Sequence, residues 1–249
     1  MKSLSSSYAS IFHKTLVLDI ETVPCEGNWQ RLDEAFQKHW RAKAEHLSLS
    51  EEEMEHPGMG FESRAGIYAE FGKVVCIGLG LLTKDDRGND LKIRLKSLFN
   101  HDEKALLAEF SQTIRAFVRI NGEIIFCGHN IREFDIPFLC RRFLINGLPL
   151  PDSMQFGGLK PWQVPMEDTL HLWRFGDYKH YTSLDLLATV LNVPSSKTDL
   201  DGSQVAEVYW KEKNLEKIAD YCLRDIYTTA LVYLKLKGWQ GALPTAEKA

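Results

Sequence analysis

The sequence predicts one α/β domain built on a mixed β-sheet. Three observations support this prediction: short apolar runs alternate with segments of helical periodicity, the 249 residues suit one large domain, and 44% of them are hydrophobic. This apolar content is enough to bury a core without disulfides. The 30 basic and 34 acidic residues give a formal net charge of −4, which excludes a broadly basic nucleic-acid binder. Any nucleic-acid surface must therefore be a local patch.

The first apolar run, residues 14–20, predicts a buried strand that ends in charge at Asp19 and Glu21. Residues of about 25–70 then show helical patterns, the first over 29–47, interrupted by Pro and Gly. We expect this stretch to be a helical insertion after the first strand.

The middle of the chain predicts a strand pair and then a strand between two helices. The apolar run 71–82 and the alternating run 91–98 flank a turn cluster at 85–90, which is typical of an antiparallel pair. The next elements are a helix over 102–120, a strand over 123–127 and a helix that ends near residue 143.

The last third predicts a short fifth strand and three closing helices. The strand is expected near 162–166, and the helices over 183–191, 202–211 and 215–236. We expect the tail 238–249 to be frayed. The result is a mixed five-stranded sheet flanked by helices.

The chain shows no sign of a membrane segment or a secretory leader. Residues 1–13 are rich in serine and lack an apolar core, and the longest apolar runs are far shorter than the ~20 residues that span a bilayer. The five cysteines have no CxxC spacing, which suits reduced thiols. We therefore expect a cytoplasmic protein.

The pair Asp19-Ile-Glu21 is the first candidate functional motif. Residues i and i+2 of a strand point to the same face, so both carboxylates meet beyond the carboxyl end of the strand, where α/β sheets bind ligands. Two close carboxylates repel unless a cation lies between them, and oxygen ligands suit Mg²⁺ or Mn²⁺. Taken alone, the pair is more typical of surface acids where a strand exits into solvent.

Two further motifs follow in the chain. Asn130 and Asp135 lie between the fourth strand and the helix that Pro137 helps to begin, so Asp135 on its own also fits a helix N-cap. Tyr221 and Asp225 are four residues apart and share one helix face. In isolation that pair also fits a surface Asp beside a core Tyr.

The three motifs in this order resemble those of the DEDDy 3′–5′ exonucleases. The local sequences at 17–24, 128–139 and 183–187 are similar to those of the predicted exonucleases related to the proofreading domain of family B DNA polymerases. The resemblance covers about 14–237. It implies an RNase H-like (DnaQ-like) fold and a single exonuclease domain over 1–249.

The resemblance also implies a role for each motif residue. Asp19, Glu21 and Asp225 are expected to bind one Mg²⁺ or Mn²⁺ ion. Asp19 is also expected to bridge to a second ion, which Asp135 holds largely through water. Tyr221 is expected to orient the attacking water. These five residues are the expected catalytic set.

The expected reaction is hydrolysis at the 3′ end of single-stranded or frayed DNA, with release of nucleoside 5′-monophosphates by two metal ions. RNA is an alternative substrate, and a catalytically silent nucleic-acid-binding module is an alternative function. The candidate substrate contacts are Ile20, Thr22, Asn130 and Phe134, although Phe134 also fits core packing.

Other residues near the motifs have weaker assignments. Six basic residues are candidates for a local surface that binds phosphate, and each also fits a solvated surface charge. They are Arg132, Arg141, Arg142, Lys179, His180 and Lys197. We expect Asp168 to cap a helix or support the site from outside the metal set. We expect His129 to pack near the site without binding metal. Trp162 and Trp173 are expected in the core.

Overall fold

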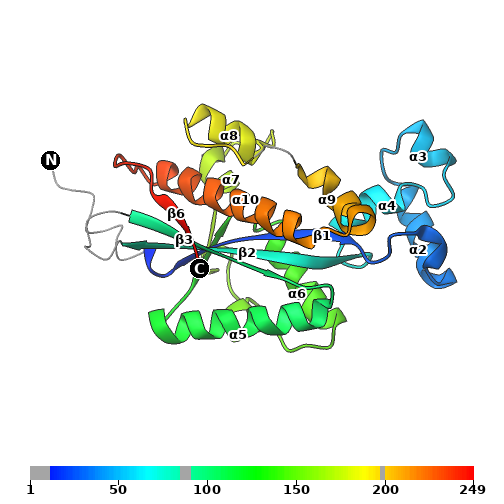
Figure 1. The fold of residues 1–249 in the computed structure, drawn as a ribbon, viewed down its shortest axis with the longest axis horizontal. Helices are drawn as coiled ribbons and strands as arrows, with labels where there is room; N and C mark the ends of the chain where they lie inside the picture. The colour runs from blue at the N-terminus through cyan, green and yellow to red at the C-terminus, as the bar shows by residue number, and fades with distance from the viewer. Residues whose placement is uncertain (1–11, 85–90, 197–199) are drawn as a thin grey trace.

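The computed structural model describes residues 12–84, 91–196 and 200–249. Within this part of the chain, a six-stranded mixed sheet has the strand order β5-β4-β1-β2-β3-β6. Helices cover both of its faces: α10, α7 and α8 lie on one side, and α5 and α6 on the other (Figure 1). The turn predicted at 85–90 and the candidate Lys197 lie outside the described residues.

The sheet is organised around β1. The strands are β1 (Thr15–Pro24), β2 (Gly72–Lys84), β3 (Leu91–Phe99), β4 (Ile125–Gly128), β5 (Met166–Asp168) and β6 (Thr245–Lys248). β1 pairs antiparallel with β2 and parallel with β4, and β2 and β3 form the predicted antiparallel pair. Val17 and Leu18 are neighbours in a strand and point to opposite faces of the sheet. Because helices cover both faces, both side chains are fully buried.

The predicted count of five strands is wrong because the tail contributes a sixth. β6 runs parallel to β3, with Lys92 opposite Thr245, so the tail that we expected to be frayed is paired to the sheet. Its side chains are exposed and carry no apolar pattern, since only its backbone covers the open edge of β3. The fifth strand is also shorter than predicted and begins at Met166 rather than 162.

The helices follow the predicted order with local differences. They are α2 (Glu34–Ala44), α3 (Glu51–Glu55), α4 (Phe61–Arg64), α5 (Glu103–Asn121), α6 (Asp135–Ile145), α7 (Thr169–Arg174), α8 (Leu184–Val190), α9 (Val205–Glu207) and α10 (Leu215–Leu236). The helix expected from residue 29 begins only at Glu34, because the Asp33 side chain caps it by accepting the amide of Phe36 at 2.9 Å. The short helix α7 was not predicted. None of the described helices has the length and apolar character needed to cross a bilayer.

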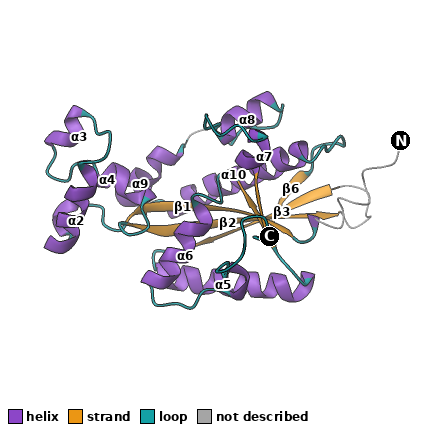
Figure 2. Cartoon of the chain, turned by 180° about the vertical axis from the view of Figure 1, so that it is seen from behind, coloured by secondary structure: helices purple, strands orange, loops and turns teal. Residues whose placement is uncertain are grey.

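Two cores lie on opposite faces of the sheet. On one side, Leu18 and Phe126 of the sheet pack with residues of α5 and α6. On the other side, Val17 of the sheet belongs to the same core as Ile226 of α10. The view from behind shows α5 and α6 on the face opposite α10 (Figure 2). The sheet therefore holds β1 rigidly between two packed layers.

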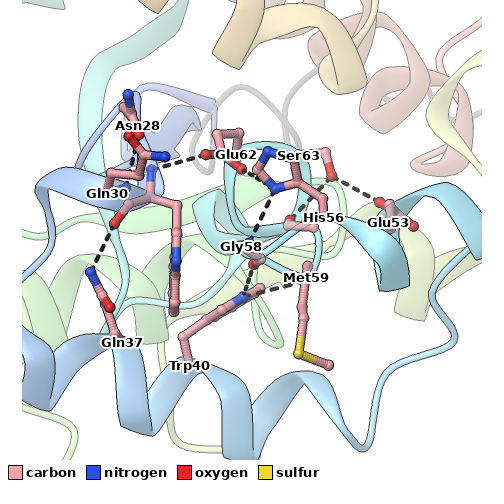
Figure 3. A network of polar contacts seen from close by, with 12 residues as sticks. Asn28, Gln30, Gln37, Trp40, Glu53, His56, Gly58, Met59, Glu62 and Ser63 are labelled. Carbon is pink, nitrogen blue, oxygen red and sulfur yellow. Dashed lines mark hydrogen bonds and ion pairs between the residues drawn. The ribbon is translucent and has the colours of Figure 1, made fainter.

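The predicted insertion has a small core of its own around Trp29, Trp40 and Phe61. The Trp40 indole donates to the Gly58 carbonyl at 2.8 Å, and Glu62 accepts the backbone amide of Trp29 at 2.9 Å (Figure 3). This network joins segments that are 18 and 33 residues apart in the chain. The insertion is thus a folded unit at the end of the sheet and not an open loop.

The insertion lies close against the end of β1. A Cβ atom added at Gly66 would come within 3.2 Å of the backbone of Val23, and one at Gly72 would come within 2.7 Å of the Gly66 carbonyl oxygen. Glycine at these positions permits the close approach. It brings the last part of the insertion to the end of β1, close to Asp19 and Glu21.

Candidate active site

Four of the five predicted catalytic side chains surround one cavity along the C-terminal part of β1. The strand runs on to Pro24, so the prediction that it ends at Asp19 and Glu21 is wrong. Asp19, Glu21, Tyr221 and Asp225 line this cavity, which has a volume of about 360 Å³. A β-bulge follows Glu21, so the strand alternation holds through both acids and places them on the same face. Helix α10 packs across β1 and β2 and brings the other two side chains to the same point.

The fifth residue, Asp135, lies behind the cavity wall. Its side chain is 2% exposed, and its Oδ1 accepts the backbone amide of Ile20 at 3.1 Å. Asp135 is the first residue of α6, whose N-cap position is held by Phe134, so the alternative of Asp135 as the N-cap is wrong. The carboxylate instead ties the start of α6 to the strand segment between Asp19 and Glu21.

Asp19, Glu21 and Asp135 are difficult to ionise at the same time. Burial, followed by the charges of Asp135 and Asp225, raises the pKa of Asp19 well above its ordinary value. Burial and then the charge of Asp19 do the same to the pKa of Glu21, and burial raises the pKa of Asp135 to about 7. All of these acids can be ionised at neutral pH only if a bound cation offsets their repulsion.

The donor atoms are close enough for one ion. One side-chain ligand atom each from Asp19, Glu21 and Cys222 lies within 4.8 Å of the others. The Cys222 thiol also lies 3.7 Å from Asp19 Oδ2. Since Asp225 lines the same cavity, the hard oxygen donors outnumber the single sulfur. This donor set fits a hard divalent ion such as Mg²⁺ or Mn²⁺.

Tyr221 remains protonated in this setting. Burial raises its pKa above the ordinary value, and the charges of Asp225 and Glu21 and a hydrogen bond to Asp225 add to the effect. The hydroxyl therefore donates its hydrogen, while its oxygen can still accept one. A group of this kind positions a partner and does not act as a base near neutral pH.

The turn between β4 and α6 is held by Asp168. Its carboxylate accepts the backbone amides of Asn130 at 3.0 Å and Arg132 at 3.1 Å, and it caps α7 through the amide of Leu170 at 2.9 Å. The expected capping role of Asp168 is therefore present. Asn130 sits in the left-handed region with φ of 62° and does not line the cavity.

His129 is also occupied by structural contacts. Nδ1 lies 2.9 Å from the Thr169 hydroxyl, and Nε2 donates to the Thr182 carbonyl at 3.0 Å. Burial lowers the pKa of its ring. Like Asp168, it fixes the loops beside the site, which is the packing role expected for it.

The remaining predicted substrate contacts lie in the cavity wall. Ile20, Thr22 and Phe134 all line it, and Phe134 also packs against Phe138 with ring centroids 5.5 Å apart, so the two alternatives for Phe134 are compatible. Several wall residues were not predicted: Pro24, Ser63, Gly66, Ile67, Tyr181, Gly202, Ser203 and Ala206. No pattern in the chain reveals that the insertion folds back to this point.

Two of the weaker assignments are corrected by the structure. Arg142 is buried and bound to Glu103, with Nη2 and Oε2 2.6 Å apart, so it is not part of a phosphate-binding surface. Trp162 is 77% exposed and does not belong to the core. Arg141, Lys179 and His180 are exposed, as surface cations should be.

Residues 67–249 match the model of a family described as predicted 3′–5′ exonucleases related to the exonuclease domain of PolB. The chain belongs to this family. It is therefore a predicted 3′–5′ exonuclease, as the sequence motifs indicated. The family match includes Asp135, Tyr221 and Asp225, whereas Asp19 and Glu21 precede it and are brought to the site by β1.

The fold is confirmed by a solved structure. The chain resembles the family B DNA polymerase from the hyperthermophilic archaeon Pyrobaculum calidifontis, with a TM-score of 0.52 and 16% sequence identity. The similarity covers 89% of this chain and 24% of the polymerase, so the chain spans about a quarter of that protein. This supports the predicted RNase H-like fold. No curated protein matches the chain.

The raised carboxyl pKa values predict how stability depends on pH. These acids bind protons more tightly when folded, so their stabilising effect is complete below the unfolded pKa of about 4 and is lost as the pH rises through about 7. We expect the melting temperature in EDTA to fall between pH 5 and pH 8. Adding Mg²⁺ should raise it more at pH 8. Asp135→Asn should flatten the fall; an equally steep fall in that variant would contradict the assignment.

Proposed function

We propose that this protein is a divalent-metal-dependent 3′–5′ exonuclease that hydrolyses the terminal phosphodiester bond of single-stranded or frayed DNA and releases nucleoside 5′-monophosphates. The observation that carries the proposal is the shared cavity of Asp19, Glu21, Tyr221 and Asp225, with Asp135 directly behind it. An acidic cavity of this kind repels a phosphate unless cations reverse its charge.

Mg²⁺ or Mn²⁺ fits the site because the acids cannot all ionise without compensation. Asp19, Glu21 and Asp225 would hold one ion. Asp19 and Asp135 would hold a second, and the Asp135 oxygen already bonded to Ile20 favours contact through water. When bound, two such ions lower the pKa of water and stabilise the entering and leaving oxygens of a phosphoryl transfer.

The protein's own groups orient the reactants. Tyr221 donates to Asp225, and its oxygen can accept a hydrogen from the attacking water and aim the water's lone pair at phosphorus. Phe134, just before α6, and Ile67, in the insertion, both line the cavity. They offer apolar surface to the terminal base and sugar. Thr22 offers a hydroxyl to the end of the strand.

The direct test uses oligonucleotides labelled at one end. With Mn²⁺, a 5′-labelled single strand should shorten one nucleotide at a time, and a 3′-labelled strand should release labelled mononucleotide at once. EDTA should stop the reaction, and fresh Mn²⁺ should restore it. The same assay should include blunt duplex DNA and RNA of the same sequence.

The outcomes separate the alternatives. Internal cuts, or release from the 5′ end, would contradict the 3′–5′ direction. Faster loss of RNA than of DNA would replace the proposed substrate by RNA. Binding of the strand without any hydrolysis at saturating Mn²⁺ would favour the silent nucleic-acid-binding module.

A further inference from the structure

Four exposed aromatic rings lie on two loops, one of which reaches the cavity through Tyr181. Among the described residues, the four most exposed aromatic side chains are Phe175 (87%), Trp162 (77%), Tyr178 (67%) and Tyr181 (62%). They belong to two loops, before β5 and between α7 and α8. Single exposed apolar residues need no explanation, but a group of large rings on adjacent loops indicates an interaction surface.

The loops are anchored to the turn that enters the active site. Arg132 donates to the Pro161 carbonyl at 3.4 Å and so fixes the loop that carries Trp162. Arg174 lies 3.5 Å from Glu133, the residue before Phe134. The rings are thus held on structured backbone and not on free loop tips.

The second loop leads directly into the cavity. Tyr181 lines it, and the His129 side chain holds the next residue through the Thr182 carbonyl. Phe175 is six residues before Tyr181, so the two lie at most roughly 20 Å apart along an extended chain. A strand of at most about six stacked nucleotides spans that maximum distance.

The backbone at Phe175 is strained in a way that packing does not explain. Its φ is 45°, in the left-handed region, although Phe has a Cβ atom and the ring is almost fully in solvent. Glycine would fit this helix end at lower cost. A left-handed residue at a helix C-terminus is common, but a bulky and exposed ring is an unusual choice for it.

Cations accompany the rings. Lys160 Nζ lies 5.3 Å from the centroid of Trp162, and the Arg174 guanidinium lies 5.5 Å from that of Tyr178. The nearby acids are largely engaged, because Asp168 is buried against backbone amides and Glu167 pairs with Lys237 at 3.0 Å. Asp177 remains exposed among them.

We propose that Phe175, Tyr178 and Tyr181, with Lys179, form a track that binds the single strand upstream of its 3′ end. Base stacking on successive rings, with cations beside them for the phosphates, is the chemistry of single-strand binding without sequence preference. The track deepens the proposed exonuclease function and rests on it. It commits to single-stranded DNA as the occupant and predicts that affinity grows with strand length up to about six nucleotides.

The test measures affinity against strand length. Fluorescence anisotropy with oligo-dT of 3, 6 and 12 nucleotides, in Ca²⁺ to prevent cleavage, should show tighter binding from 3 to 6 and little gain beyond. Phe175→Gly and Tyr178→Ala should each weaken binding of the 6-mer about 5–50-fold, as expected for the loss of one stacked base. Lys179→Glu should lower affinity and reduce its salt dependence.

The controls distinguish binding from folding. Phe175→Gly removes the ring but relieves the left-handed strain, so its melting temperature should be equal to or above that of the parent. Ile120→Ala alters a side chain that is 77% exposed at the end of α5, on the other face of the sheet, and should not change affinity. Affinity equal to the parent in both Phe175→Gly and Tyr178→Ala would overturn the track. A parent that degrades no strand would instead overturn the exonuclease proposal.

Discussion

Asp225→Asn is expected to lower turnover of a single-stranded oligonucleotide about 10³-fold, which corresponds to about 4 kcal/mol. The substitution keeps the shape of the side chain and removes one carboxylate from a cavity that it shares with Asp19 and Glu21. Fewer anionic ligands weaken the binding of a hard cation. The measurement is single-turnover hydrolysis of end-labelled DNA at saturating Mn²⁺.

The same variant should fold at least as stably as the parent when no metal is present. The charge of Asp225 is one cause of the raised pKa of both Asp19 and Glu21, so its removal relieves repulsion. Loss of activity together with an unchanged or higher melting temperature in EDTA would thus assign Asp225 to metal binding. A parental rate in Asp225→Asn would show that the residue holds no essential ion.

Tyr221→Phe is the matched companion, because it keeps the buried ring of this α10 residue and removes only the hydroxyl. We expect Mn²⁺ affinity to stay near the parental value, since the hydroxyl is not among the proposed ligands. Turnover should fall about 10–100-fold, as expected for loss of one hydrogen bond that positions the water. An equal loss of Mn²⁺ affinity and turnover would make Tyr221 part of the metal site instead.

Arg142→Met is expected to lower the free energy of unfolding by about 3–5 kcal/mol, the effect of breaking a buried ion pair from one side. The Arg142 guanidinium donates to Glu103 at 2.9 and 2.6 Å and to the Ala69 carbonyl at 2.7 Å. It joins α6, α5 and the end of the insertion. Glu103 also accepts the Val74 amide at 2.7 Å, so the variant leaves a buried carboxylate without its cation. Urea denaturation measures the change.

Two variants control this result. Arg141→Met changes the exposed neighbour on the same helix and should cost less than about 0.5 kcal/mol. The double variant Arg142→Met with Glu103→Gln should recover part of the loss, because glutamine carries no charge and can still accept the Val74 amide. A cost below about 1 kcal/mol for Arg142→Met alone would mean that the ion pair contributes little to stability.

The predictions that succeeded rest on local chemistry. The alternation of a strand places Asp19 and Glu21 on one face, and helical spacing places Tyr221 beside Asp225. Both relations hold in the structure because they involve neighbours within one element. The apolar runs likewise predicted β1, β2 and β3 and the antiparallel pairing of β2 with β3.

The predictions that failed involve partners far apart in the chain. Arg142 looked like a surface cation because no local feature marks Glu103 as its partner across 39 residues. The tail looked frayed because Thr245–Lys248 has no apolar face, yet the open edge of β3 orders its backbone. In both cases the stabilising group is supplied by another element.

The sequence by itself therefore predicted the central strands, the candidate acidic set with its tyrosine and the family to which the chain belongs. Only the tertiary structure decided which surfaces close around those acids, namely the returning end of the insertion at Ile67 and the anchored loop at Tyr181, and that β6 completes the far edge of the sheet. The physical reason is that spacing along one strand or helix fixes the direction of neighbouring side chains. Contacts between distant segments depend on how the elements pack, which no local pattern encodes.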